Sequence, residues 1–278
     1  MKKLLRWIKG LKINGKKYLY FGYYPQTVAN VTGLTLTESE TVTCNYGNIS
    51  TYTKYTDSDG NEYVKITASP YDSSYTYSNG TTVTATETYF KVEPLKWRIL
   101  SENADGTALI VCDQAIKAMA CGSNDEFYKD RKLRAYLTGD FYNRTFTVDE
   151  KASIKLTKIQ NIRINYDDGT EGYNEGNTSD YIFALSYQDM TNSNYGFSTS
   201  TSASTTRMFN CTDYSIANYA AMRGIDESNR AGVVWTRTGV EGRDPEDTWA
   251  VYGEGDLYGG ANAYENCYCA LPALNIIL

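Results

Sequence analysis

A chain of 278 residues can bury a full hydrophobic core in one large domain or in two ordinary ones. It contains no histidine, which excludes Ser–His and Cys–His nucleophile pairs, histidine-ligated zinc and the commonest general base. The net charge is −6, and residues 159–278 carry six arginines and no lysine against 16 carboxylates. Because such a half repels phosphate backbones, we expect no nucleic-acid partner and favour a protein or a carbohydrate.

Residues 1–17 are a basic N-terminal arm or helix. Their lysines and arginines alternate with Leu4, Ile8 and Leu11, which are spaced as on one helix face. The pattern fits a short amphipathic helix at a membrane or partner surface, and equally a terminal arm with a solvated face. No apolar run suits a signal peptide, and none reaches the roughly 18 residues of a membrane span. We therefore expect cytoplasmic synthesis and no transmembrane segment, with display on a virion or cell surface left open.

Residues 18–122 are predicted to be β-rich. A first strand over 18–26 ends at Pro25, and residues 34–90 are rich in Thr, Ser and Tyr, which is typical of inserted hairpins. Two further strands are predicted at 89–100 and 108–112. Tight-turn dipeptides, Asp-Gly or Asn-Gly, occur at 59–60, 79–80 and 105–106.

Short capped helices are predicted next, at the start of residues 123–278. Ser123 and Glu126 have the spacing of a capping box, and apolar residues within 133–137 share one helix face. Gly139 is a suitable residue to end this helix.

Two more helices are predicted further along the chain. Thr147 and Glu150 repeat the capping-box spacing, and Thr212 opens a helix over 213–222 that ends at Gly224. Strands followed by segregated helices and then by strands again indicate an α+β fold.

Strands at 232–238 and 272–276 close the chain, and the residues between them are mostly small or polar, punctuated by tyrosines. Tyr, Gly, Ser and Asn are enriched in evolved binding surfaces, because Tyr supplies stiff amphipathic area and the small residues supply adaptable hydrogen bonds. A binding surface and a loop-rich hairpin end with solvated tyrosines both fit this composition.

No segment carries recognisable catalytic chemistry. Residues 57–62 superficially resemble a calcium loop but lack the acidic residue at its far end, so a hairpin turn is predicted. Asp167 and Asp168 read as solvated loop acids, and no glycine-rich phosphate cradle is present. We expect no metal, no cofactor and no enzymatic activity. Six cysteines occur without a Cys-x-x-Cys pair or a secretory signal, which argues against zinc and a disulfide framework: Cys44, Cys112, Cys121, Cys211, Cys267 and Cys269.

The chain resembles a bacterial family of unknown function that is often the target protein of diversity-generating retroelements. The C-terminal part of that family is similar to the C-type lectin fold and to the last domain of the phage major tropism determinant. The resemblance begins near residue 18, and its strength is the common order of seven separated segments: 21–27, 93–100, 133–137 with 141–143, 181–186, 212–214, 235–238 and 272–274.

The resemblance implies a binding protein whose contact residues are diversified by adenine-directed copying errors. Such errors in Asn codons never produce Lys, Gln, Met, Trp or Glu, and residues 252–269 lack all of these except Glu254 and Glu265. The implied variable region is 240–269. Its expected contacts are Tyr252, Asp256, Tyr258, Gly259, Gly260, Asn262, Tyr264, Asn266, Cys267 and Tyr268, and further candidates are Val240, Gly242, Arg243, Asp244 and Asp247.

A freely varying site needs a scaffold held by other residues. In this chain the resemblance assigns that role to Trp235, Arg237, Val251, Leu257, Pro272 and Leu274. One departure is Leu271, where the family usually carries an arginine, and this leaves the boundary of the variable region less well defined.

Two alternatives to a diversified binding surface stay open. The same fold serves formylglycine-generating enzymes, which oxidise a substrate with a cysteine pair near the C-terminus, and here only Cys267 and Cys269 fit that position. The other is an invariant glycan- or wall-binding module whose tyrosines stack on sugars. An oligomer is compatible with either binding role.

Overall fold

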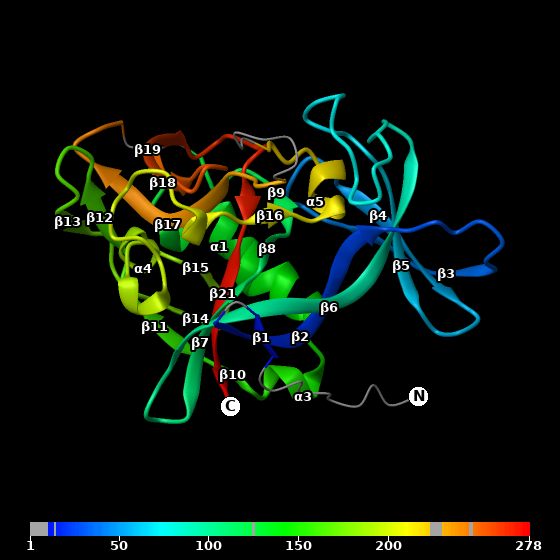
Figure 1. The fold of residues 1–278 in the computed structure, drawn as a ribbon, viewed down its shortest axis with the longest axis horizontal. Coiled ribbons are helices and arrows are strands. Elements are labelled where there is room, and N and C mark those ends of the chain that lie inside the picture. Colours follow the sequence, from blue (N-terminus) through cyan, green and yellow to red (C-terminus); the bar gives the residue numbers. More distant parts are fainter. Residues whose placement is uncertain (1–10, 14, 124–125, 223–229, 245–246) are drawn as a thin grey trace.

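One long strand, β6 (Glu87–Glu102), runs across the molecule and connects its two halves (Figure 1). In the computed structural model, which describes residues 11–13, 15–123, 126–222, 230–244 and 247–278, β2 (Lys16–Val28) pairs with β6 along most of its length. The first half of β6 also pairs with β5 (Glu62–Thr67) and the second half with β7 (Thr107–Cys112). A single strand therefore carries the hairpins at one end and the C-terminal strands at the other.

The larger sheet holds ten strands among the described residues. The last strand of the chain, β21, lies between β10 and β7, so the C-terminal segment completes a sheet that the N-terminal half begins. Besides β2, β5, β6 and β7, its strands are β1 (Leu11–Ile13), β3 (Leu36–Thr43), β4 (Thr51–Asp57), β10 (Ile154–Lys155), β15 (Phe183–Ala184) and β21 (Pro272–Ile277).

The smaller sheet belongs mainly to the C-terminal half. In the part of the chain that the structure describes it has seven strands: β9 (Lys117–Ala118), β12 (Ile162–Asn165), β13 (Glu171–Asn174), β17 (Val234–Glu241), β18 (Asp247–Val251), β19 (Leu257–Asn262) and β20 (Cys269–Ala270). Short pairs are formed by β11 (Thr157–Ile159) with β14 (Thr178–Asp180) and by β8 (Gln114–Ala115) with β16 (Asn210–Cys211).

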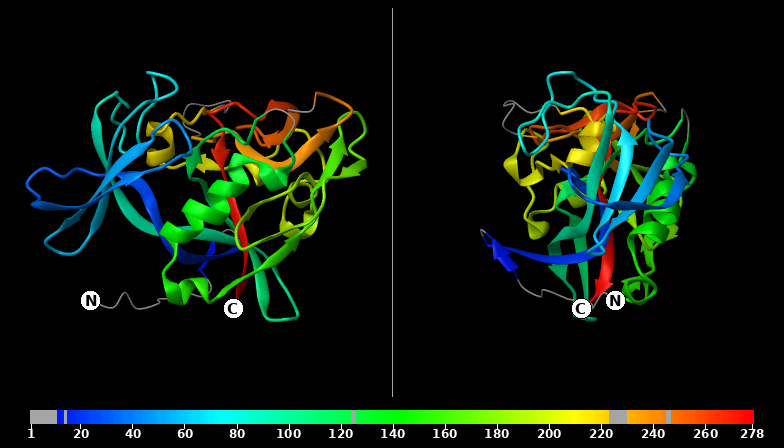
Figure 2. Two further views of the ribbon diagram at one scale, coloured as in Figure 1. Left: turned by 180° about the vertical axis from the view of Figure 1, so that it is seen from behind. Right: turned by 90° about the vertical axis from the view of Figure 1, so that its right-hand side faces the viewer.

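The helices are short and lie on both sides of β21, as the right-hand view of Figure 2 shows. On one side a continuous helical segment contains α1 (Lys132–Tyr136), the π-helical turn η2 (Leu137–Phe141) and α2 (Tyr142–Thr145), followed by α3 (Val148–Lys151). On the other side are α4 (Tyr187–Met190) and α5 (Asp213–Ala217). The 3₁₀ turns are η1 (Tyr128–Asp130), η3 (Ser193–Tyr195) and η4 (Thr205–Arg207).

One hydrophobic core runs through both halves, and it is anchored by two fully buried tryptophans. The indole nitrogen of Trp97 donates to the carbonyl of Phe21, and that of Trp235 donates to the carbonyl of Met119. Because a buried indole N–H is costly unless it is hydrogen-bonded, these bonds fix each ring against a specific strand.

The strands expected at 18–26, 89–100 and 108–112 and the tight turns expected in the first half are present, with limits that differ by up to two residues. Gly60, Gly80 and Gly106 all have positive φ angles, as tight turns require, and residues 57–62 form the turn between β4 and β5 rather than a calcium loop. The α+β class is also correct. The capping box of Thr147 and Glu150 is present in full at α3, and the Thr212 side chain caps α5.

Several element limits differ from prediction. The described residues 11–13 and 16–17 pair as strands rather than forming a helix, and residues 1–10 lie outside the described part. Pro25 lies inside β2 and Gly139 inside η2, so neither ends its element.

Two predicted helices are shorter than expected. The Ser123 amide donates to Glu126, but the helix begins only at Lys132, and residues 124–125 lie outside the described part. The α5 helix ends at Ala217 because Tyr219 takes a left-handed conformation, while residues 223–229 are not described.

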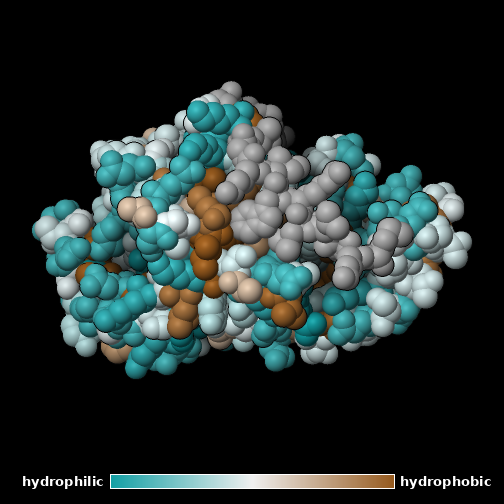
Figure 3. Space-filling model, turned by 90° about the horizontal axis from the view of Figure 1, so that it is seen from below, coloured by the Kyte–Doolittle hydropathy of each residue, from teal (hydrophilic) through white to brown (hydrophobic). Residues whose placement is uncertain are grey.

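The end of the molecule that carries the C-terminus shows a narrow hydrophobic band between hydrophilic residues (Figure 3). Exposed apolar residues in the elements at this end are Val148, Leu156, Ile277 and Leu278. No helix among the described residues is long and apolar enough to cross a membrane.

Candidate functional site

The segment 240–269 forms one edge of the smaller sheet and the turns beyond it. β18 and β19 pair as a hairpin, closed by a turn in which the Tyr252 amide donates to the Asp256 carbonyl and Gly255 has φ of 79°. The predicted contacts that are exposed or partly exposed are Tyr252, Asp256, Tyr258, Gly260, Asn262, Tyr264, Asn266, Gly242, Arg243 and Asp244.

Five predicted contacts are buried, which corrects their placement on a surface. They are Val240, Asp247, Gly259, Cys267 and Tyr268, and of these five Gly259 alone lines the hollow described next. Strand geometry explains the burial of Val240 in β17 and of Gly259 in β19. Successive residues of a strand face opposite sides, and only one side of each of these strands meets solvent.

A hollow of about 340 Å³ opens beside this hairpin, and we call it the aromatic groove. Four segments far apart in the sequence build it: the loop after β12, the start of α4, the Ser/Thr-rich loop at Thr201 and the β18–β19 hairpin. Its lining residues are Tyr166, Asp167, Asp168, Gly169, Tyr187, Thr201, Trp249, Leu257, Tyr258 and Gly259.

Stacked rings form the wall of the aromatic groove. The Tyr166 ring stacks on Trp249 with centroids 6.0 Å apart, and the Tyr187 ring packs against the same indole at 4.6 Å. The Trp249 indole nitrogen donates to the Ile164 carbonyl, so the central ring is fixed. The Arg243 guanidinium lies 4.0 Å from the Tyr166 centroid, a cation–π contact that covers the outer ring.

Gly259 has no side chain, and this leaves space for the Tyr166 and Trp249 rings. A methyl group there would come within 2.9 Å of the Tyr166 ring and 3.0 Å of the Trp249 indole. Because Trp249 is buried and hydrogen-bonded, it cannot move aside cheaply. Gly259 is therefore a packing position of the groove rather than one that varies freely.

A chain of aromatic rings connects the surface to the core. Tyr258 is 39% exposed and meets Tyr252 edge-on, and Tyr252 in turn shares a hydroxyl hydrogen bond of 2.9 Å with Tyr268. Tyr268 is 4% exposed and packs on Trp235 at 4.9 Å. The tyrosines of this segment thus have distinct roles, and only Tyr258 and Tyr264 are well exposed.

The residues expected to form the scaffold are buried or partly buried. Trp235, Val251, Leu257, Pro272 and Leu274 are buried, and Arg237 is partly buried. The Arg237 guanidinium binds the Asp189 carboxylate at 2.7 Å and the Ala184 carbonyl at 2.9 Å, which ties β17 to α4 and β15. Leu271 is also buried.

Arg207 has a structural role that the sequence did not reveal. Its fully buried guanidinium donates to the carbonyls of Ser198, Ser202 and Gly255. These bonds hold the Ser/Thr-rich loop against the β18–β19 turn, and Leu257 also donates its amide to Thr201 in that loop. A single arginine within a Ser/Thr-rich segment was the available signal.

Carboxylates line one rim of the aromatic groove. Asp167 and Asp168 are exposed, as expected for loop acids, and hydrogen bonds from Thr170 lower the pKa of the Asp168 carboxyl. The Asp168 carboxylate is therefore ionised at neutral pH and offers hydrogen-bond acceptors beside the rings.

The cysteines are all free and buried. Cys269 is hydrogen-bonded to Cys211, and this bond together with burial raises the pKa of Cys269 well above its usual range. Within the described ranges, no group of three or more Cys, Asp or Glu side chains is arranged to hold a metal ion.

The fold and the groove together define the class of this chain: it is an α+β protein with an aromatic hollow on its surface, at the edge of a sheet. It belongs to the family described as Domain of unknown function (DUF6273), which matches residues 96–278. The match includes β7, the helices, the smaller sheet and the aromatic groove, but not the hairpins β3 to β5. No curated protein and no solved structure matches the chain.

Proposed function

We propose that this chain is a ligand-binding protein that presents the aromatic groove and its neighbouring tyrosines to a protein or glycan. The observation that carries the proposal is the rigid stack of Tyr166, Trp249 and Tyr187 next to exposed Tyr258. Preformed aromatic surface loses little entropy on binding, and ring faces beside ionised carboxylates suit sugars as well as peptide side chains.

In this proposal residues 123–278 form a C-type lectin-like scaffold, and a retroelement diversifies the exposed part of 240–269 in a receptor-binding or adhesion-type protein. The proposal is supported by the position of the segment between two buried strands, β17 and β21, which hold it at both ends. Variation would then be confined to exposed positions, because substitution at Gly259 or Tyr268 disturbs packing.

A binding screen tests the proposal. The protein is applied to a glycan array and to a panel of bacterial cells, alongside the Tyr258→Ala and Tyr264→Ala variants. We expect each variant to weaken the signal by roughly 1–3 kcal/mol while stability changes by less than about 0.5 kcal/mol. Tyr173→Ala is the matched control, since Tyr173 is 58% exposed on β13, away from the groove lining. Equal binding by all variants would refute a site at the groove.

Sequencing of the source DNA tests diversification separately. A nearby near-copy of the codons for 240–269, with adenines wherever the two differ and a reverse transcriptase gene beside it, is the expected finding. A sequence that is invariant among isolates would leave a fixed binding module.

A further inference from the structure

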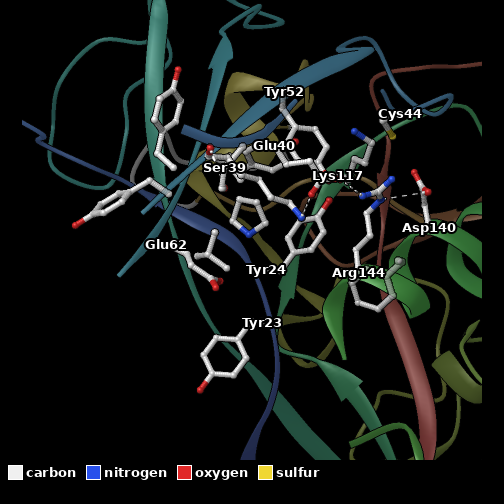
Figure 4. Close-up of a pocket in the computed structure, with 18 of the residues that line it drawn as sticks. Tyr23, Tyr24, Ser39, Glu40, Cys44, Tyr52, Glu62, Lys117, Asp140 and Arg144 are labelled. Carbon is white, nitrogen blue, oxygen red and sulfur yellow. Dashed lines mark hydrogen bonds and ion pairs between the residues drawn. The ribbon is translucent and has the colours of Figure 1, made fainter. Parts of the chain in front are cut away.

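A second and larger hollow lies on the other half of the molecule, between the hairpins and the helices. Its volume is about 510 Å³, and β2, β3 and β4 form one side while α1, η2 and α2 form the other (Figure 4). Because tyrosines dominate its lining, we call it the tyrosine pocket. Its lining includes Tyr24, Tyr52, Tyr136, Lys117, Arg144 and Asp140.

Lys117 brings a buried charge to the wall of this pocket. It is 2% exposed, and within the described part of the chain its ammonium makes no hydrogen bond or ion pair. The ammonium lies 6.0 Å from the centroid of the Tyr214 ring. Burial lowers the pKa of the Lys117 ammonium, and Cys44 and Asp140 oppose this shift only through space. A buried ammonium without a partner is costly, so its presence in the pocket wall calls for an explanation.

The other cations of the pocket already have partners. The Arg144 guanidinium lies 3.4 Å from the Asp140 carboxylate and 3.9 Å from that of Glu40. The Lys54 ammonium binds Glu40 at 2.9 Å. Lys117 is therefore the uncompensated charge in a lining whose remaining charges are paired or exposed.

Two tyrosines provide a hydrogen-bond donor in the same pocket. The hydroxyls of Tyr24 and Tyr136 are joined by a hydrogen bond of 2.8 Å. Only one of the two protons lies between the oxygens, so the second is available to an acceptor from outside. Burial raises the pKa of both hydroxyls well above the usual range and that of Tyr52 to about 12, so all three stay protonated and can donate.

We propose that the tyrosine pocket binds a small organic carboxylate, with its anionic group held by Lys117 and a tyrosine hydroxyl and its body packed among the rings. A single unpaired cation near the Asp140 carboxylate favours a monoanion over a doubly charged phosphate. The volume fits a ligand built around one or two rings. This site is separate from the aromatic groove and does not depend on the function proposed for it.

Benzoate is the probe, benzamide its neutral match, and inorganic phosphate the test of a simple anion site. Each is titrated into the full-length protein and binding is followed by ligand-observed and protein-observed NMR. We expect benzoate to bind at least about tenfold more tightly than benzamide or phosphate. Contacts from the benzoate ring protons to Tyr24 and Tyr136 place it in the pocket.

Two matched substitutions examine the role of the charge. Lys117→Met removes the buried ammonium and is expected to weaken benzoate binding about tenfold or more. Lys54→Met removes a lining ammonium that is already paired with Glu40, and it should change the affinity less than about twofold. Tyr136→Phe keeps the ring and removes one hydroxyl, with an intermediate loss expected.

The proposal is overturned by any of three results: no benzoate binding, equal affinity for benzoate and benzamide, or undiminished benzoate binding by Lys117→Met. Tighter binding of phosphate than of benzoate would also overturn the ligand class. The comparison of probes on the unmodified protein decides the matter even where a variant fails to fold.

Discussion

The aromatic groove and the tyrosine pocket are both lined by aromatic rings, but they treat charge in opposite ways. In the groove, the Arg243 cation is satisfied by the Tyr166 ring and lies 4.0 Å from the Asp247 carboxylate. In the pocket, Lys117 is buried and makes no hydrogen bond or ion pair with any residue that the structure describes. Two hollows of similar composition therefore differ in charge: the cation beside the groove has partners, whereas the lysine in the wall of the pocket is uncompensated.

The largest expected effect separates the core from the surface within the tyrosine-rich segment. Tyr268→Ala should destabilise folding by about 3–5 kcal/mol, because it empties a buried site against Trp235 and removes a hydroxyl partner of Tyr252. Tyr264→Ala, at a position 50% exposed, is the control and should change stability little. Urea unfolding measures both. Equal stability of the two variants would place Tyr268 outside the core.

The next prediction concerns the rigidity of the groove. Gly259→Val should cost about 1–3 kcal/mol, since its side chain would overlap the Tyr166 and Trp249 rings. Gly260→Val is the matched control, because its side chain meets the flexible ends of Tyr258 and Arg243. Urea unfolding gives the stabilities, and near-UV circular dichroism reports the aromatic packing. A Gly259 variant as stable as the Gly260 variant would show that the groove wall yields easily.

The third prediction concerns the tyrosine pocket, where a substitution is expected to stabilise the protein rather than to destabilise it. Lys117→Met should stabilise the ligand-free protein by about 1–3 kcal/mol, because it removes a buried charge that lacks a partner. The Lys117 pKa is lower in the folded than in the unfolded chain, so the penalty is full below the folded value. As pH rises from the folded value toward the ordinary lysine value, the unfolded chain binds more protons and the penalty fades.

Urea unfolding at neutral pH and in steps up to about pH 10 measures this difference. The advantage of Lys117→Met should shrink as pH rises, whereas Lys54→Met should show no such trend. A destabilised Lys117→Met variant at neutral pH would mean that the ammonium has a stabilising partner in the folded chain.

Local signals in the sequence predicted a large part of the fold. Glycine-containing turns, the capping residues Thr147 and Thr212, and alternation in the strands act over a few residues, so they are readable without the tertiary structure. The long pairing of β2 with β6 kept Pro25 inside a strand, which no local rule reveals. The early end of α5 likewise depends on Tyr219 in its tertiary setting.

The candidate site was predictable only in part, because the residues that line the groove come from segments far apart in the sequence. Tyr258 lies in the segment that composition indicated, but Tyr166 and Tyr187 reach the groove from elsewhere in the chain. The predicted contacts also differ in burial, since Tyr268 lies in the core and Tyr264 at the surface. The sequence did not distinguish them. Lys117 gave no signal, since only the fold shows that its side chain is buried without a partner.

The smallest expected effect tests the contrast between the two charges most directly. Arg243→Gln should destabilise the protein by only about 0.5–1 kcal/mol, the usual contribution of an exposed cation–π contact. Its sign is nevertheless opposite to that of Lys117→Met, because Arg243 lies where partners already exist. The effects of the two substitutions should also differ in their dependence on salt. Screening should reduce the Arg243 effect between low and high ionic strength, whereas the buried Lys117 effect should persist.

Urea unfolding of Arg243→Gln and Lys117→Met at about 0.05 M and about 1 M sodium chloride measures this salt dependence. If the Arg243→Gln effect is independent of salt, the contact acts through packing of the guanidinium on Tyr166 rather than through charge. If both substitutions stabilise the protein, the groove also holds an uncompensated cation and the two sites share one design. A small loss at Arg243 that salt abolishes, beside a salt-independent gain at Lys117, would show that the Arg243 charge has partners in the folded chain and that the Lys117 charge is uncompensated.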